Sequence, residues 1–144
     1  MELINDSLVA LDIDLPSKQC VIEKIADLLE ESDRLINRQQ YIKDVFEREE
    51  IISTYIDDMI VIPHARSAAI NNASLVYLRL NQPVDWNATE KAKFVFGIAV
   101  PADNVDNEYL KILATFARKL LDDTIKPIIF GSKSKEEILV ALLS

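Results

Sequence analysis

The segment from Phe94 to Val100 does most to restrict the folds open to this 144-residue chain, because it is almost entirely apolar. A strand that is apolar on both faces has to be covered on both faces, as in the central strands of α/β proteins. Pro101 follows the run and ends it, since proline cannot donate to a sheet ladder. The run therefore predicts a strand over 93–100 inside a sheet that helices cover on both faces.

The rest of the chain alternates between helical and strand patterns. Apolar spacing and capping residues predict helices at 18–31, 37–50 and 124–130, a long helix after Asp106, and a last helix after Ser134. Strand patterns cover 8–13, 59–62 and 74–80, and the composition of 53–58 and 82–87 predicts a turn and a loop. The length and the lack of a linker predict a single domain over 1–144.

Composition excludes several classes of function. The net charge is −8 and no basic cluster appears, which argues against nucleic-acid binding. The acidity suits a basic protein partner, or it serves solubility alone. The only two glycines, Gly97 and Gly131, rule out a glycine-rich phosphate loop. No stretch is apolar for the roughly 20 residues that a membrane span needs, and no secretory signal is apparent. The single cysteine, Cys20, is consistent with a cytoplasmic protein.

The chain has one histidine, His64, directly after the apolar run that ends at Pro63. One imidazole excludes any site with two histidine ligands. Pro63 tends to end a strand, which predicts an exposed ring at the strand's terminus. A neutral imidazole can attack phosphorus near pH 7, and the arginines Arg48 and Arg66 could stabilise the phosphoryl charge. A histidine at a strand end can equally be a satisfied structural residue, and Arg48 a solvated helix end.

The residues around this histidine form a longer pattern. Arg48-Glu49 is followed by the run from Thr54 through Pro63-His64-Ala65, and further matches follow in order at 83–86, 94–101 and 109–114. In this ordered set the chain resembles the enzyme IIA domains of the phosphoenolpyruvate-dependent sugar phosphotransferase system, of the fructose/mannitol class (type 2 EIIA). The resemblance covers essentially the whole chain and implies a mixed, mostly parallel β-sheet flanked by helices in three layers.

The resemblance also implies roles for individual residues. His64 matches the histidine that is phosphorylated in this family, and Arg48 matches the arginine beside it. Many members have a second histidine where this chain has Tyr109, whose hydroxyl could donate a hydrogen bond or whose ring could only pack. Asp57 and Asp58 stand in the turn where the family often has glycine and asparagine, and their charges would oppose phosphorylation unless they point away.

Together these features predict a cytoplasmic phosphotransferase component that needs no metal or cofactor. His64 would accept a phosphoryl group from the phosphocarrier HPr and pass it to a cysteine of an enzyme IIB, which works with a membrane enzyme IIC in sugar uptake. The candidate site residues are His64, Arg48, Tyr109 and Arg66. One alternative is a regulatory IIA-like module that signals its phosphorylation state by binding another protein. Another is an α/β binding protein with an inert histidine. The sequence leaves the sugar, the phosphorylated ring nitrogen and the oligomeric state open.

Overall fold

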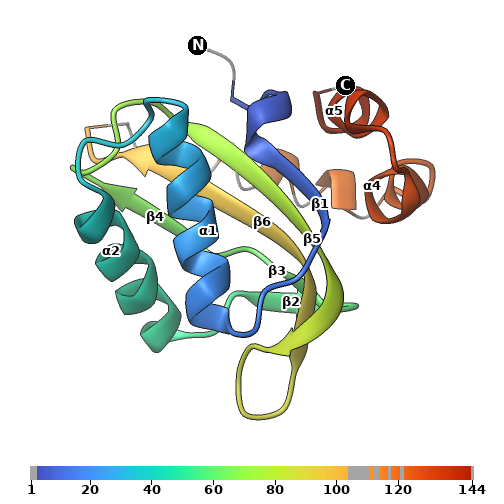
Figure 1. Cartoon of the computed structure of the whole chain (residues 1–144), viewed down its shortest axis with the longest axis horizontal. Helices are drawn as coiled ribbons and strands as arrows, with labels where there is room; N and C mark the ends of the chain where they lie inside the picture. The colour runs from blue at the N-terminus through green and yellow to red at the C-terminus, as the bar shows by residue number, and fades with distance from the viewer. Residues whose placement is uncertain (1–2, 104–110, 112–113, 117, 121, 144) are drawn as a thin grey trace. The chain divides into compact units, whose positions relative to one another are not determined.

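The computed structural model describes residues 3–103, 111, 114–116, 118–120 and 122–143. These residues fall into two compact units, Met1–Ala102 and Asp103–Ser144 (Figure 1). The first unit contains a β-sheet with two helices, and the described elements of the second are helical. The proposed site residues His64, Arg48 and Arg66 all belong to the first unit.

Six strands form one mixed sheet in the first unit. They are β1 (Val9–Ile13), β2 (Tyr55–Asp57), β3 (Ile60–Val61), β4 (His64–Ser67), β5 (Ser74–Asp85) and β6 (Lys91–Pro101), and a short 3₁₀ helix, Asp6–Leu8, precedes them. The order across the sheet is β1-β5-β6-β3-β2, and β4 also pairs with β6. The pairs β1–β5, β3–β6 and β4–β6 are parallel, whereas β5–β6 and β2–β3 are antiparallel. The predicted fold class, a mixed and mostly parallel sheet with flanking helices, is confirmed.

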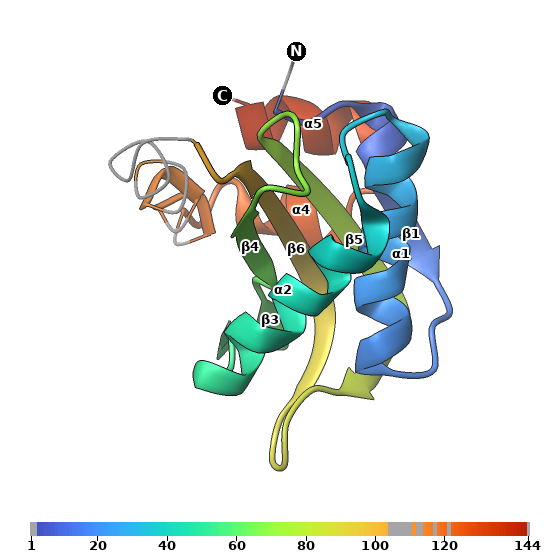
Figure 2. The same ribbon diagram turned by 90° about the vertical axis from the view of Figure 1, so that its left-hand side faces the viewer.

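Helices α1 (Lys18–Glu31) and α2 (Arg38–Ile51) agree with the prediction within a residue at each end. Side chains cap both, because Ser17 Oγ accepts from the Cys20 N–H at 3.2 Å and Asn37 Oδ1 accepts from the Gln40 N–H at 3.1 Å. Helix α1 packs against β5 and α2 against β4, and both lie in front of the sheet in Figure 1 and are seen from the side in Figure 2. This packing sets the C-terminal end of α2 near the start of β4.

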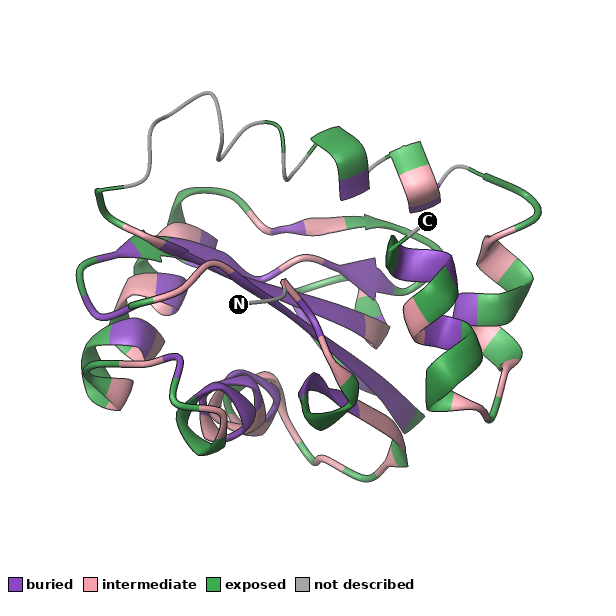
Figure 3. Ribbon diagram, turned by 90° about the horizontal axis from the view of Figure 1, so that it is seen from above, coloured by how far each residue is buried: buried purple, intermediate pink, exposed green. Residues whose placement is uncertain are grey.

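The core of the first unit follows β5 and β6, whose residues are buried over most of their length (Figure 3). The Tyr77 ring stacks on the Phe96 ring with centroids 4.7 Å apart. Gly97 of β6 lies directly under α1, since a Cβ built there would be 2.8 Å from the Cγ2 of Ile25. A side chain at position 97 would therefore force the Ile25 side chain to move.

The second unit contains α4 (Lys126–Gly131) and α5 (Lys135–Leu143). Helix α4 confirms the short helix predicted at 124–130. The Glu137 N–H donates to Ser134 Oγ at 3.2 Å, as the predicted cap of the last helix requires. The described residues at 111, 114–116 and 118–120 are helical, in line with a long helix, whereas its predicted cap, Asp106, lies outside the described residues.

Two predictions on β2 and β5 are wrong. Half of the turn expected at 53–58 is strand β2, and the chain reverses at its last residue, Asp58, and at Met59, both left-handed with φ of 51° and 64°. A two-residue hairpin turn of this kind needs two positive φ values, which composition alone did not locate. The loop expected at 82–87 begins as the end of β5, because Val84 pairs with Ala92 and Asp85 with Lys91 beyond a register shift.

Candidate functional site

His64 is the first residue of β4, just after an interruption in a longer strand. Val61 of β3 pairs with Val95 of β6, and His64 pairs with Ile98, so that the chain runs along β6 on both sides of Ile62 and Pro63. Strand β3 ends at Val61, before Pro63 as predicted, but a new strand, β4, begins at His64 and pairs with the same neighbour. Pro63 lacks an N–H, yet its carbonyl accepts from the Ile98 N–H at 3.0 Å and holds the chain on β6. His64 therefore sits within the sheet rather than at its terminus.

The His64 side chain is also less accessible than predicted. The residue is 7% exposed, whereas the sequence predicted an exposed ring, and α2 packed against β4 accounts for the difference. Its Nδ1 lies 2.7 Å from the carbonyl oxygen of Ile62. A carbonyl oxygen can only accept, so Nδ1 carries the proton, and in the neutral ring the lone pair is on Nε2.

The surroundings of His64 lower its pKa below the usual 6.5. Burial is the largest cause because it disfavours the charged imidazolium, and the nearby Arg48 guanidinium lowers the pKa further. The hydrogen bond to Ile62 and the Glu49 carboxylate act in the opposite direction. The ring is consequently neutral at pH 7, the form in which an imidazole nitrogen is nucleophilic.

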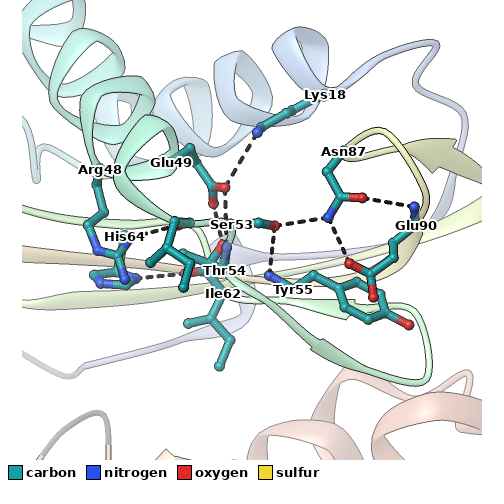
Figure 4. A network of polar contacts seen from close by, with 11 residues as sticks. Lys18, Arg48, Glu49, Ser53, Thr54, Tyr55, Ile62, His64, Asn87 and Glu90 are labelled. Carbon is teal, nitrogen blue, oxygen red and sulfur yellow. Dashed lines mark hydrogen bonds and ion pairs between the residues drawn. The ribbon is translucent and has the colours of Figure 1, made fainter.

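Arg48 lies in the last turn of α2 and is drawn beside His64 in Figure 4. Its Nη1 donates to the Ile52 carbonyl at 2.8 Å, which closes the end of the helix. Among the residues that the structure describes, no carboxylate forms an ion pair with Arg48. The guanidinium charge therefore remains available to an anion that approaches His64.

Glu49, the neighbour of Arg48, is buried, and the sequence analysis gave it no role of its own. Its Oε2 accepts from Lys18 Nζ at 3.4 Å and from the Thr54 N–H at 3.3 Å, and its Oε1 accepts from the Thr54 hydroxyl (Figure 4). Tyr41, Val45 and Glu49 are the buried residues of α2, spaced four apart. A carboxylate at the third position of this buried stripe was the signal that could have identified it.

The remaining predicted residues lie elsewhere. Arg66 is exposed on β4, two residues after His64 and so on the same face of the strand. Tyr109 lies outside the described residues. Asp57 and Asp58 are at the turn of the β2–β3 hairpin, while Ile62, whose carbonyl holds His64, is at the other end. The two aspartates thus lie away from the ring.

Within the described ranges, no cluster of three or more histidine, cysteine, aspartate or glutamate side chains is arranged to hold a metal ion. None of the helices in this part of the chain has the length and apolar character needed to cross a bilayer.

The site consists of a histidine on a strand, held through Nδ1, and an arginine at the end of a helix. The sequence shows the family to which such a site belongs. Residues 2–144 match the family described as "Phosphoenolpyruvate-dependent sugar phosphotransferase system, EIIA 2", and the chain belongs to this family.

Individual relatives agree with this assignment. The chain is 30% identical to the mannitol-specific phosphotransferase enzyme IIA component of Staphylococcus aureus, over 95% of this chain and 92% of that protein. It is 28% identical to the fructose-specific EIIABC component of Bacillus subtilis, of which it spans only 22%. The chain likewise spans 22% of a 2-O-alpha-mannosyl-D-glycerate-specific EIIABC component of Escherichia coli and 16% of a multiphosphoryl transfer protein of Shigella flexneri.

Solved structures show the same fold. A nitrogen regulatory protein IIA-Ntr from Neisseria meningitidis superposes with a TM-score of 0.87 at 27% identity, covering 97% of this chain and 96% of that one. IIA mannitol from Escherichia coli gives a TM-score of 0.78 at 19% identity, with 96% and 98% covered. A further structure, at a TM-score of 0.79 and 17% identity over 97% and 96% of the two chains, is described as a complex of enzyme IIAMTL with phosphorylated enzyme IIBMTL from Escherichia coli.

Proposed function

We propose that this protein is a phosphocarrier that takes a phosphoryl group on Nε2 of His64 and hands it to a partner protein. The observation that carries the proposal is a neutral imidazole, held by Nδ1, beside a guanidinium whose charge no carboxylate among the described residues neutralises. In the transfer, the Nε2–P bond forms as the N–P bond of the donor breaks. Nδ1 keeps its proton, and the ring becomes cationic while it carries the group.

Arg48 has the chemistry to stabilise the reacting phosphoryl group. Phosphoryl transfer is catalysed mainly by positioning and by electrostatic stabilisation of the phosphoryl oxygens. A guanidinium presents two donors in one plane, which suits two of these oxygens at once. Arg66 and Tyr109 stay predictions as further donors, Arg66 because it shares a strand face with His64 and Tyr109 because of its place in the family pattern.

The donor and acceptor are proposed from the family. The donor would be phosphorylated HPr, and the acceptor a cysteine of an enzyme IIB that works with a membrane enzyme IIC; the complex described for the mannitol relative supports the IIB partner. Two exposed apolar residues at the end of α2, Ile51 and Ile52, would form the docking patch. This patch adjoins Arg48 through the Ile52 carbonyl, and a small apolar centre suits transient complexes.

The test is transfer of labelled phosphate from phosphoenolpyruvate through enzyme I and HPr, followed by a chase with candidate IIB domains. The wild-type chain should take up one acid-labile phosphoryl group and lose it to a IIB cysteine. His64→Ala should take up none, and because the chain has a single histidine this variant removes every possible phosphohistidine. Equal labelling of the two proteins would overturn the proposal.

A regulatory module is the second candidate, and the similarity to the nitrogen regulatory protein IIA-Ntr favours it, since that match is at 27% identity over nearly the whole of both chains. Such a module would accept the label on His64 and keep it in the chase with every IIB domain. Its phosphorylated and unphosphorylated forms would differ in binding to a regulated protein. Transfer to a IIB domain would decide for the transport role.

A further inference from the structure

The β2–β3 hairpin contains an incomplete backbone pair next to the site. Tyr55 is opposite Val61, so the next pair along the hairpin is Thr54 with Ile62. Residues that form such a hydrogen-bonded pair in an antiparallel ladder normally exchange two N–H to carbonyl bonds. Only one is made here, from the Ile62 N–H to the Thr54 carbonyl at 3.1 Å. The Thr54 N–H donates instead to Glu49 Oε2 at 3.3 Å.

The missing bond has a direct consequence for His64. If the Thr54 N–H closed the pair, it would donate to the Ile62 carbonyl. That carbonyl instead accepts from His64 Nδ1 at 2.7 Å. Glu49 therefore takes the donor that would compete with the imidazole for this oxygen. The two hydrogen bonds lie at the two ends of one short path, Glu49 to Thr54 to Ile62 to His64 (Figure 4).

Glu49 is well held in this role. Its side chain is 2% exposed, and its carboxylate accepts from Lys18 Nζ at 3.4 Å and from both the N–H and the hydroxyl of Thr54. Lys18 is fixed in turn, with its Nζ 4.8 Å from the centre of the Trp86 ring. A buried carboxylate that satisfies several donors from two other segments is a rigid anchor for them.

We propose that Glu49 is a positioning residue for the phosphoryl-accepting histidine, which it serves by withholding the Thr54 N–H from the Ile62 carbonyl so that this oxygen fixes the Nδ1–H form of His64. The inference rests on the proposed function for its purpose, but its geometry can be tested on the unphosphorylated protein. Without Glu49, the Thr54 N–H would be free to complete the pair, and the Ile62 carbonyl would share its two lone pairs between this donor and Nδ1, which weakens its preference for the Nδ1–H form of the ring. The neutral ring would then populate both tautomers, and Nε2 would carry a proton in part of the molecules.

The decisive experiment is NMR of ¹⁵N-labelled protein, in which the one histidine gives an unambiguous pair of ring nitrogen signals. Above the pKa of His64, the wild type should show a protonated Nδ1 and an unprotonated Nε2. Glu49→Ala should show averaged signals from both tautomers. Glu49→Gln, which keeps an acceptor oxygen but no charge, should stay closer to wild type in the tautomer. Wild-type ring signals in a folded Glu49→Ala protein would overturn the inference.

Glu49 could affect His64 through its charge as well as through its hydrogen bonds. The pKa of His64, measured in the same samples, reports the effect of the charge. The charged groups that affect the pKa of the ring are Arg48 and Glu49, both on α2, while Arg66 lies two residues away on β4. Glu49→Gln should lower the pKa, since the Glu49 carboxylate favours the imidazolium. Glu50→Gln is the matched control, because it removes an exposed carboxylate one residue further along the same helix. It should leave both the tautomer and the pKa as in the wild type.

The rate of phosphoryl acceptance tests whether the positioning of His64 by Glu49 matters for the reaction. Glu49→Ala should slow phosphoryl acceptance by about 10- to 100-fold, the usual cost of a lost outer partner or a misplaced reacting group. Glu50→Gln should accept at the wild-type rate. If wild-type protein accepts no phosphoryl group while Glu49→Ala still changes the tautomer, the proposed function fails and the positioning role stands. An unchanged tautomer with a slower reaction would refute the role stated here.

Discussion

Two arginines of the first unit differ in whether a carboxylate balances their charge. Arg79 of β5 is 3% exposed and forms a two-pronged pair with Asp12 of β1, with Nε to Oδ1 at 2.9 Å and Nη2 to Oδ2 at 3.1 Å. Arg48 is half-buried and donates to a backbone carbonyl. The charge of Arg79 is balanced within the fold and joins two strands, whereas that of Arg48 has no fixed counter-ion among the described residues. The difference supports the proposal that Arg48 binds an external anion.

The largest expected effect is on the Arg48 side of this comparison. Arg48→Gln should lower the rate of phosphoryl acceptance by about 10²- to 10³-fold, as the loss of one preorganised donor at a reacting group does. It should change the free energy of unfolding by less than about 1 kcal/mol, because only a helix-end contact is lost. Labelling by phosphorylated HPr and urea unfolding measure the two quantities.

Arg66→Gln is the control for this variant, since it removes an exposed arginine two residues after His64. A clearly smaller loss than in Arg48→Gln would separate the two arginines, and its size would measure what Arg66 adds as a further donor. Equal losses in both variants would mean that the unpaired state of Arg48 does not distinguish it, and the comparison with Arg79 would lose its functional meaning.

The Arg79 pair should instead matter for stability. Asp12→Asn should lower the free energy of unfolding by about 3 kcal/mol, because it leaves a buried guanidinium without this carboxylate. Asparagine tolerates the left-handed backbone of Asp12, which has a φ of 56°, so the substitution adds little strain. Urea unfolding gives the change. The folded fraction should accept phosphate at the wild-type rate, and a slower rate in fully folded protein would contradict the division of roles.

The third prediction concerns how the stability of the protein depends on pH through His64, whose pKa Arg48 helps to lower. The pKa of His64 in the folded state is below 6.5, its value in the unfolded chain, because of burial and then of Arg48. Between these two pH values the unfolded state binds more protons, so stability falls as the pH drops from 6.5 through the folded pKa and is fully restored above 6.5. An NMR titration of the single histidine gives the folded pKa, and urea unfolding of wild type and His64→Gln against pH gives the linkage. A folded pKa of 6.5 or above would contradict the expectation.

The smallest effect is expected from a simple anion. Inorganic phosphate should bind weakly beside Arg48, shifting the NMR signals of the Arg48 and His64 side chains in the millimolar range, because a single unbalanced guanidinium offers one charged fork. The Arg79 side-chain signals should not move, since Asp12 already occupies that fork. Sodium chloride at the same ionic strength is the control. Shifts at both arginines would remove the contrast between them.

The sequence predicted the helices of the first unit and the two-sided central strand because apolar spacing and capping side chains are local signals. Ser17 and Asn37 both cap helices at the expected positions. The burial of His64 was not predictable in this way, since it depends on α2 packing against β4, a contact between distant segments. The role of Glu49 was missed for the same reason, because its partners Lys18 and Thr54 come from two other segments.

The strand errors have a different cause. Aspartate tolerates positive φ but methionine rarely adopts it, so the identity of Met59 gave no sign of a two-residue turn at Asp58 and Met59. Pro63 reads as a strand end in the sequence, but the neighbouring β6 holds the chain in line through the Pro63 carbonyl. The identity of a residue shows which backbone conformation it disfavours. Whether it adopts that conformation in the fold depends on the strand with which its segment pairs.

The near-complete burial of the His64 ring bears on how long a phosphoryl group would remain on it. A phosphorus–nitrogen bond is susceptible to hydrolysis, and water needs an open approach to the phosphorus opposite the ring. With 7% of the residue exposed, solvent has little access to the ring, whereas a partner protein that docks here would bring its reacting group with it. The packing that buries the histidine would thereby slow hydrolysis and lengthen the time during which the phosphoryl group can be transferred to a partner protein.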